Sequence, residues 1–159
     1  MMLVHEQQLQ PNWCWVACFR MACSSFSILT SAQCLLAQQF LSIANCCPAG
    51  SNPACNATIP ETEIPGLYSS VALAATVIPI SDGTFRQSLS SELIVLGMIA
   101  YPATYHFIII SSFADGAYTV NDPEYAQPLS ATFVNISAYP NGSLEKAWSL
   151  SKLKSARID

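Results

Sequence analysis

The sequence predicts an α+β protein in which helices come first and a mostly antiparallel sheet follows. Residues 13–24 are apolar nearly all round, which is typical of a buried central helix. The second half of the chain carries short apolar segments, and Asp115-Gly116 separates two of them as a hairpin turn does. Helices followed by consecutive antiparallel strands are the pattern of the α+β class.

The first half of the chain predicts two helices and one long loop. An extended lead-in at residues 3–8 precedes the helix at 13–24, and a second helix is expected at 32–43, capped by Ser31. Residues 45–66 contain four prolines, which forbid long helices. A loop of this length is unusual unless it is cross-linked or functional.

The second half of the chain predicts most of the sheet. We expect a short helix at 66–74, a strand at 76–80, a helix that opens with the capping box Thr84-Phe85-Arg86-Gln87 and stops near Gly97, and strands at 98–101, 105–113, 117–121 and 131–136. The result is a single domain, 1–159, with a helical lobe at about 9–75, a sheet lobe at about 76–145 and a basic C-terminal tail at 146–159 that we interpret as a solvated terminal helix.

Composition excludes several classes of protein. Hydrophobic residues make up 52% of the chain and charged residues 10%, well below the usual quarter, so the chain is not a disordered one. Residues 1–145 hold nine acids against Arg20 and Arg86, and such an acidic body disfavours nucleic acid as a partner. Gly97 interrupts the longest apolar stretch, so we expect no membrane span. Residues 1–5 lack the features of a signal peptide.

The chain has seven cysteines, a high number for 159 residues. Four of them, Cys34, Cys46, Cys47 and Cys55, gather around the 45–66 loop and predict disulfides in an oxidising compartment, with the pairing left open. Cys18 and Cys23, on the first helix, are expected to be buried thiols or a further pair. Zinc is the rival interpretation, but the sequence has no Cys-x-x-Cys pair and neither His lies near the cysteine cluster, so we expect no metal and no cofactor.

Cys14 stands in the run Gln8-Leu9-Gln10-Pro11-Asn12-Trp13-Cys14-Trp15-Val16-Ala17. Pro11 halts any earlier helix, and Asn12 can act as N-cap, which places Cys14 in the first turn of the helix. Unpaired backbone N–H groups and the helix dipole favour a thiolate there. The thiolate is the reactive form of cysteine, so this position suits a nucleophile.

A thiol nucleophile needs a base and a group that orients the base. His106 opens the apolar run 107–110, and the turn at 114–116 folds the next strand back beside it. That return brings Asp122 close to the imidazole, and Pro123 ends the strand because it has no N–H to donate. His5 is the poorer base because it lies in the extended lead-in.

These residues resemble the papain-like cysteine peptidases. The segment from Gln8 to Ala17 resembles their active-site helix start, and His106 with Asn121-Asp122-Pro123 resembles the second catalytic half of their fold. The closest likeness is to short bacterial members near the bacteriocin-leader peptidases and secreted effector peptidases. The likeness runs from about residue 7 to residue 125. It implies a papain-like fold with the active site between the first helix and the sheet.

The resemblance also implies roles for the site residues. Cys14 is the expected nucleophile, His106 the general base and acid, and Asp122 the group that orients His106. Gln8 is expected to donate its side-chain amide to the oxyanion hole together with the backbone N–H of Cys14. Gln7 and Gln10 compete with Gln8 for that role, and Asn121 competes with Asp122. Val16 and Cys18 depart from the small residues that are usual in the family.

We therefore expect a cysteine peptidase that cleaves a protein or peptide substrate, exported as a toxin or effector. A toxin of this kind would have an immunity or inhibitor protein as partner. One alternative keeps the Cys-His-Asp triad but performs deamidation, transglutamination or peptide ligation, since all of these pass through the same thioester. The other is a catalytically silent binding module cross-linked by disulfides. No motif in the sequence indicates which substrate sequence is cleaved or which oligomeric state the protein adopts.

Overall fold

The computed structural model describes residues 3–153, which form five α-helices, two short 3-10 helices and six strands. The helices are α1 (Cys14–Ser25), α2 (Gln33–Leu41), η1 (Pro53–Cys55), η2 (Glu61–Glu63), α3 (Ile64–Ser69), α4 (Asp82–Ser90) and α5 (Phe133–Ser137). The strands are β1 (Leu73–Val77), β2 (Ile94–Ala100), β3 (Tyr105–Ala114), β4 (Ala117–Asn121), β5 (Leu129–Ala131) and β6 (Ser143–Lys152).

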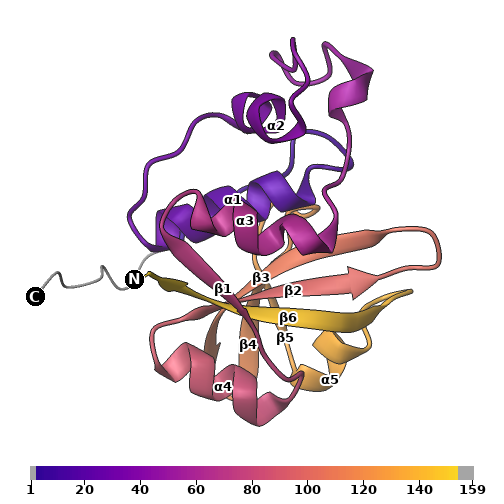
Figure 1. Cartoon of the computed structure of the whole chain (residues 1–159). Coiled ribbons are helices and arrows are strands. Elements are labelled where there is room, and N and C mark those ends of the chain that lie inside the picture. Colours follow the sequence, from indigo (N-terminus) through magenta and orange to yellow (C-terminus); the bar gives the residue numbers. More distant parts are fainter. Residues whose placement is uncertain (1–2, 154–159) are drawn as a thin grey trace, which may run out of the picture.

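The strands form one sheet with the order β1-β6-β2-β3-β4-β5, and every neighbouring pair is antiparallel. In Figure 1, α1, α2 and α3 lie on one side of this sheet, and α4 and α5 lie on the other. The α+β prediction is therefore confirmed. Helices on both faces also explain why the central strands are apolar throughout, because neither face of those strands meets water.

The sheet separates two hydrophobic cores. Side chains alternate between the two faces of a strand, so Leu96 of β2 and Ile109 of β3 pack with α1, whereas Val95 and Ile108 pack with Phe85 of α4. The first core contains most of the aromatic side chains of α1 and the buried thiols. Because α1 packs on β3, the start of the first helix is held against the strand that carries His106.

The C-terminal segment is a strand rather than the solvated helix that we predicted for 146–159. β6 lies between β1 and β2 in the middle of the sheet, and its residues 147–150 are buried. Trp148 packs in the first core and Ala147 in the second. Hydrogen bonding to a strand on each side of β6 outweighed the local sequence, which favours neither helix nor strand strongly. Residues 154–159 of the predicted tail lie outside the described residues.

The helix predicted to run to Gly97 is shorter than expected. α4 begins at Asp82, with Ser81 accepting a hydrogen bond from the Thr84 N–H, and ends at Ser90; Gly97 lies inside β2. A β-carbon at Gly97 would stand 3.1 Å from Leu144 and 3.2 Å from Ile108. The glycine therefore marks close packing of neighbouring strands and not a helix end.

Four other predicted elements also differ. The predicted strand at 131–136 is the short strand β5 followed by α5, because the Thr132 side chain accepts from the Asn135 N–H and starts a helix. The helix at 66–74 is α3, which ends at Ser69, and the strand at 76–80 is β1, which begins at Leu73. The second helix follows Ala32, and Ser31 does not cap it.

Two disulfides cross-link the 45–66 loop, as predicted from the cysteine cluster. Cys34 of α2 pairs with Cys47, and Cys46 pairs with Cys55 of η1. Cys18 and Cys23 are buried free thiols. Burial raises the pKa of Cys18 well above its ordinary value and that of Cys23 to about 12, so both stay protonated near neutral pH. The disulfides fit an oxidising environment.

Removing the link between α2 and the loop should destabilise the protein. We expect the double variant Cys34→Ser with Cys47→Ser to lower the free energy of unfolding by about 3 kcal/mol, because the disulfide restricts the unfolded chain. Urea denaturation followed by fluorescence would measure the change. Cys23→Ser, which removes no cross-link, is the reference variant, and equal midpoints for wild type and the double variant would contradict the expectation.

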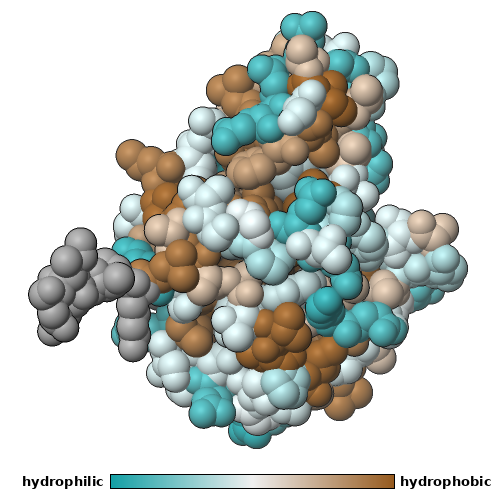
Figure 2. All heavy atoms as spheres, in the orientation of Figure 1, coloured by the Kyte–Doolittle hydropathy of each residue, from teal (hydrophilic) through white to brown (hydrophobic). Residues whose placement is uncertain are grey.

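Exposed apolar side chains are scattered over the surface. Figure 2 shows brown groups over the loop between α1 and α2 and over the segment that leads from β1 to α4, each surrounded by hydrophilic residues. Leu29 in the first segment is 99% exposed, and Ile80 in the second is 36% exposed. Within residues 3–153, no helix combines the length and the apolar character needed to cross a bilayer.

Candidate active site

Cys14 is the first residue of α1, as predicted, but the helix start is built differently. Trp13 is the N-cap residue, and no side chain within residues 3–153 caps the first turn. Asn12 instead bonds the 45–66 loop: its side chain donates to the Asn56 carbonyl and its backbone N–H to the Asn56 side chain, both at 2.9 Å. The prediction that Asn12 caps the helix is wrong. The N–H groups beside Cys14 consequently have no side-chain acceptor.

The cross-linked loop runs along the start of α1 and holds it in place. The indole N–H of Trp13 donates to the Cys55 carbonyl at 2.6 Å, and that of Trp15 donates to the Ala57 carbonyl at 2.9 Å. Tyr105, next to His106 in β3, donates its hydroxyl to the Ile59 carbonyl. The loop therefore contacts both elements that carry the candidate nucleophile and base. Trp15 is 1% exposed, so its role is core packing.

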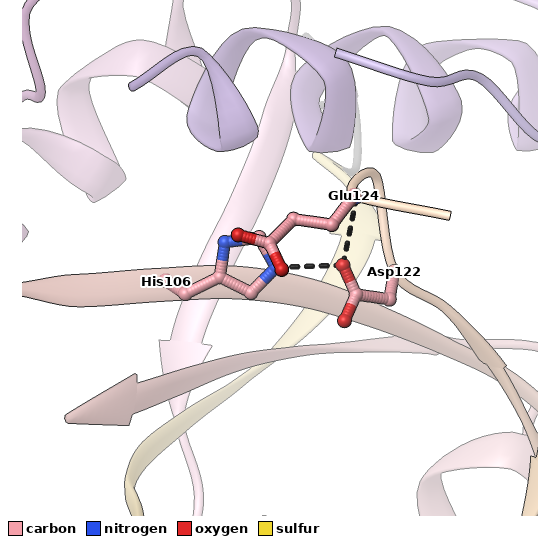
Figure 3. A group of neighbouring side chains, drawn as sticks. All are labelled: His106, Asp122 and Glu124. Atoms are coloured by element: carbon pink, nitrogen blue, oxygen red, sulfur yellow. Dashed lines mark hydrogen bonds and ion pairs between the residues drawn. The ribbon is translucent and has the colours of Figure 1, made fainter. Parts of the chain in front are cut away.

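His106 and Asp122 are hydrogen-bonded to each other (Figure 3). The Nε2 atom of His106 lies 2.7 Å from Oδ1 of Asp122, and the two residues are 5% and 0% exposed. The β3–β4 hairpin brings them together through its two-residue turn. Asp115 and Gly116 both have positive φ, 52° and 79°, as a type I′ turn requires. The hairpin prediction is therefore confirmed.

Asp122 accepts two further hydrogen bonds. The Glu124 N–H donates to Oδ1 at 2.9 Å, and the hydroxyl of Tyr139, in the loop after α5, donates to Oδ2. These donors fix the plane of the carboxylate and thereby the orientation of the His106 ring. Tyr139 was missed in the sequence because nothing local marks a tyrosine 17 residues downstream as a partner of Asp122.

The environment keeps His106 protonated. Burial by itself lowers the pKa of His106, but hydrogen bonds to Asp122 and Cys14, together with the charges of these two groups, raise it to about 10. Burial likewise raises the pKa of Asp122, yet the bond and charge of His106 outweigh it and hold that pKa below its usual value. With Nε2 on Asp122, Nδ1 is the ring nitrogen left for Cys14. His106 therefore interacts electrostatically with both Cys14 and Asp122.

Gln8 lies on the same side of the molecule as this group. Its backbone N–H donates to the Pro123 carbonyl at 2.9 Å, which ties the lead-in to the residue after Asp122. Its side-chain Nε2 donates to the Pro11 carbonyl at 2.8 Å and keeps a second N–H. Gln10 turns towards Gly50 in the 45–66 loop, and Gln7 bonds the Glu124 carbonyl. Of the three glutamines, Gln8 is the one that bonds Pro11, close in sequence to the start of α1, and its oxyanion role stays a prediction.

The lead-in is held by a polar cluster that the sequence did not reveal. Gln33 of α2 is 1% exposed, accepts from the Leu9 N–H, and donates to Glu6 and to the Gln7 carbonyl. Arg20 of α1 forms an ion pair with Glu6 at 2.7 Å. Both side chains that anchor the lead-in therefore come from helices, and they fix the residues on either side of Gln8.

The remaining sequence candidates lie elsewhere. Asn121 is buried and donates to the Ile109 carbonyl and to the Ser111 hydroxyl, so it does not orient His106. His5 bonds the Tyr125 carbonyl through Nε2. Neither residue can take the place that the structure gives to Asp122 and His106.

Comparison with models of known protein families and with curated proteins found no match. The resemblance to papain-like cysteine peptidases therefore depends on the residues and geometry described above. The chain has a cysteine at a helix start, then a histidine on a strand, then an aspartate after the hairpin. The family assignment stays a prediction.

The site also contains a potential metal-ligand group. One ligand atom each from His106, Asp122 and Glu124 lie within 4.8 Å of one another (Figure 3). However, Nε2 of His106 and Oδ1 of Asp122 already bond each other, and Oδ2 of Asp122 accepts from Tyr139. A metal ion would have to replace these bonds. The hydrogen-bonded arrangement accounts for the positions of His106 and Asp122 without one.

Removing the Tyr139 hydroxyl tests its positioning role. We expect Tyr139→Phe to lower kcat/KM by about tenfold, the size of effect seen when an orienting hydrogen bond is lost. KM should change little, because the hydroxyl contacts Asp122 and not the substrate. Tyr118→Phe, which removes a buried hydroxyl bonded to Asp82 and not to Asp122, is the matched control. An equal loss in both variants would indicate a general effect on folding.

The raised pKa of His106 predicts a pH-dependent stability. Its folded-state pKa of about 10 exceeds its ordinary value of 6.5, so protonation stabilises the fold fully below pH 6.5 and less as pH rises towards 10. The lowered pKa of Asp122 affects stability in the opposite direction. Its stabilising contribution is present above the usual pKa of an aspartate and is lost on acidification. We expect the stability difference between wild type and His106→Gln to fall by a few kcal/mol between pH 6.5 and 10, measured by urea denaturation. A constant difference would contradict this expectation.

Proposed function

We propose that this protein is a cysteine peptidase that uses Cys14, His106 and Asp122. One observation carries the proposal: a cysteine in an uncapped first helical turn interacts with a buried imidazole whose other nitrogen bonds a buried carboxylate. Nucleophile, base and orienting group are the three parts that thiol acyl transfer needs. An imidazolium and a thiolate side by side stabilise each other's charge.

The reaction proceeds in two halves. The Cys14 thiolate attacks the carbonyl carbon of a peptide bond, forming a C–S bond and a tetrahedral oxyanion. As the intermediate collapses, the C–N bond breaks and the His106 imidazolium gives its proton to the leaving nitrogen. Neutral His106 then takes a proton from water, the resulting hydroxide attacks the thioester, and Cys14 leaves as thiolate. Asp122 holds the ring and stabilises the imidazolium in both halves.

The oxyanion has two proposed donors. The backbone N–H of Cys14 belongs to the uncapped first turn of α1, and the free N–H of the Gln8 amide supplies the second. Each donor of this kind is worth on the order of 3 kcal/mol in the transition state. The Pro11 carbonyl fixes the Gln8 amide in advance, so little reorganisation is needed when the charge develops.

Transfer to another acceptor is the second candidate function. The thioester is common to hydrolysis, deamidation, transglutamination and ligation, and the Cys-His-Asp group serves all of them. The disulfides favour export, and we propose a secreted peptidase of the toxin or effector kind whose partner is an inhibitor or immunity protein. The papain-like family is the assignment that best fits the order of the three residues.

Incubation with a peptide library, followed by mass spectrometry, tests the proposal. We expect cleaved products with wild type and none with Cys14→Ala. A gain of about one mass unit without cleavage would indicate deamidation, and joined peptides would indicate ligation. EDTA should leave the activity unchanged, since no step uses a metal ion. If peptides stay unmodified and Cys14 reacts no faster with iodoacetamide than Cys18 or Cys23, the enzyme proposal is wrong. That result would favour the alternative, a binding module without catalytic activity.

A further inference from the structure

Glu124 is the exposed acid beside the candidate catalytic group. One of its carboxylate oxygens lies within 4.8 Å of a ring nitrogen of His106 and of an oxygen of Asp122. Figure 3 shows the Glu124 side chain extending from the segment after Asp122 towards the His106 ring, while its backbone bonds Asp122. Cys14, His106 and Asp122 are buried, so Glu124 is the charged side chain that an approaching substrate meets first.

The Glu124 carboxylate has no ion pair or hydrogen bond within residues 3–153. The ion pairs formed by basic side chains there use other acids: Arg20 with Glu6, Arg86 with Asp82 and Lys146 with Glu61. None of these three cations neutralises Glu124, and the imidazolium of His106, within 4.8 Å, is hydrogen-bonded to Asp122. An exposed carboxylate close to a reaction centre can pair with a cation on a bound substrate.

Glu124 borders a surface depression beside the lead-in. This depression, of about 430 Å³, is lined by residues 7–11 and Glu124. The side-chain oxygen of Gln8 is buried and has no hydrogen-bond partner among the residues that the structure describes. The lining includes the Glu124 carboxylate and no basic side chain. The carboxylate calls for a donor, and a ligand that carries N–H donors and a positive charge meets this requirement.

Nearby groups strengthen the negative character of this region. Burial raises the pKa of Tyr101, and the charges of Glu124, Asp122, Tyr125 and Cys14 raise it further. Tyr125 is 46% exposed directly after Glu124, where its ring can contact a guanidinium or ammonium group. The surroundings therefore favour a cation over a neutral or an anionic group.

We propose that Glu124 selects peptide substrates that carry a cationic group on the leaving-group side of the scissile bond. This inference deepens the proposed peptidase function and rests on it. The side follows from His106, which protonates the leaving nitrogen and lies next to Glu124. The cation is either a Lys or Arg side chain or the free α-ammonium of a short peptide, and both would form the same charge-assisted hydrogen bonds.

Cleavage-site profiling tests this specificity. We expect wild type to cleave peptides with Lys or Arg after the cleaved bond about tenfold more efficiently than peptides with Gln there, the size of effect expected from one ion pair. Glu124→Gln should lose the preference, and Glu124→Lys should favour Asp or Glu. The preference should weaken as salt is raised. Paired peptides with free and acetylated N-termini separate the two sources of the cation. Glu92→Gln removes an exposed acid from the turn that precedes β2 and should leave the preference unchanged.

Two outcomes keep the inference distinct from the proposed function. If wild type cleaves peptides but shows no cationic preference, or if Glu124→Gln keeps that preference, the inference is wrong and the peptidase stands. If wild type cleaves nothing, the inference is tested by measuring the affinity of the Cys14→Ala variant for fluorescent peptides that contain either Lys or Gln. Tighter binding of the Lys peptide that Glu124→Gln abolishes supports Glu124 as the cation site. Equal binding of the two peptides overturns it.

Discussion

Replacing Cys14 with Ser should lower kcat/KM for peptide cleavage by about 10⁴-fold or more, because the nucleophile of a triad carries most of the chemical acceleration. The same residue should be the first to react with iodoacetamide at mildly acidic pH. Cys14 is the thiol that interacts with His106, whereas burial raises the pKa of Cys18 and of Cys23 and keeps both protonated. Peptide mapping of the alkylated protein would identify the labelled site.

Cys23→Ala is the matched control for this experiment. Cys23 is a buried thiol near the other end of α1, so its removal tests the loss of a helix cysteine without touching the candidate site. We expect this variant to keep its activity in proportion to its folded fraction. Full activity in Cys14→Ser, or equal labelling of all three free thiols in the native protein, would refute the assignment of the nucleophile.

Replacing His106 with Ala should cost about 10²–10⁴-fold in kcat/KM, the range that general acid–base groups contribute. The same change should abolish the rapid alkylation of Cys14, because the thiolate loses its cation. In wild type the activity should fall as pH rises through about 10, where His106 loses the proton that it gives to the leaving nitrogen. Initial rates across pH 5–11 would measure this decline.

His5→Ala provides the matched control, since His5 is the other histidine of the chain and bonds only the Tyr125 carbonyl among the described residues. We expect it to retain the wild-type pH profile. A His106→Ala variant that still shows rapid Cys14 alkylation would mean that the helix start alone activates the thiol. In that case the imidazole would have no part in the chemistry.

The candidate site was predictable where local chemistry is distinctive. A cysteine after Pro11 and between two tryptophans, an Asp-Gly turn, and an aspartate before Pro123 each restrict the backbone or the chemistry locally. The disulfide cluster was predictable for the same reason, since four cysteines near one loop have few other uses. The helix cap at Asn12 was wrong, because the 45–66 loop offered that side chain better partners than the helix did.

The contacts that complete the site could not be predicted. Tyr139 reaches Asp122 only because α5 packs against β6, and Gln33 reaches the lead-in only because α2 docks on α1. Glu124 was recognised in the sequence only as one acid among many. Its position over His106 depends on how the chain turns after Asp122.

The amino-acid sequence by itself determined the class of fold, the hairpin that joins His106 to Asp122, and the helix that begins at Cys14. These features follow from local rules: side-chain periodicity, turn residues and proline. The tertiary structure alone decided that residues 143–152 form a central strand and that Gly97 lies within the sheet. The physical reason is that strand pairing and burial are set by distant neighbours, whose contact free energy exceeds the small local preferences of an ambiguous segment.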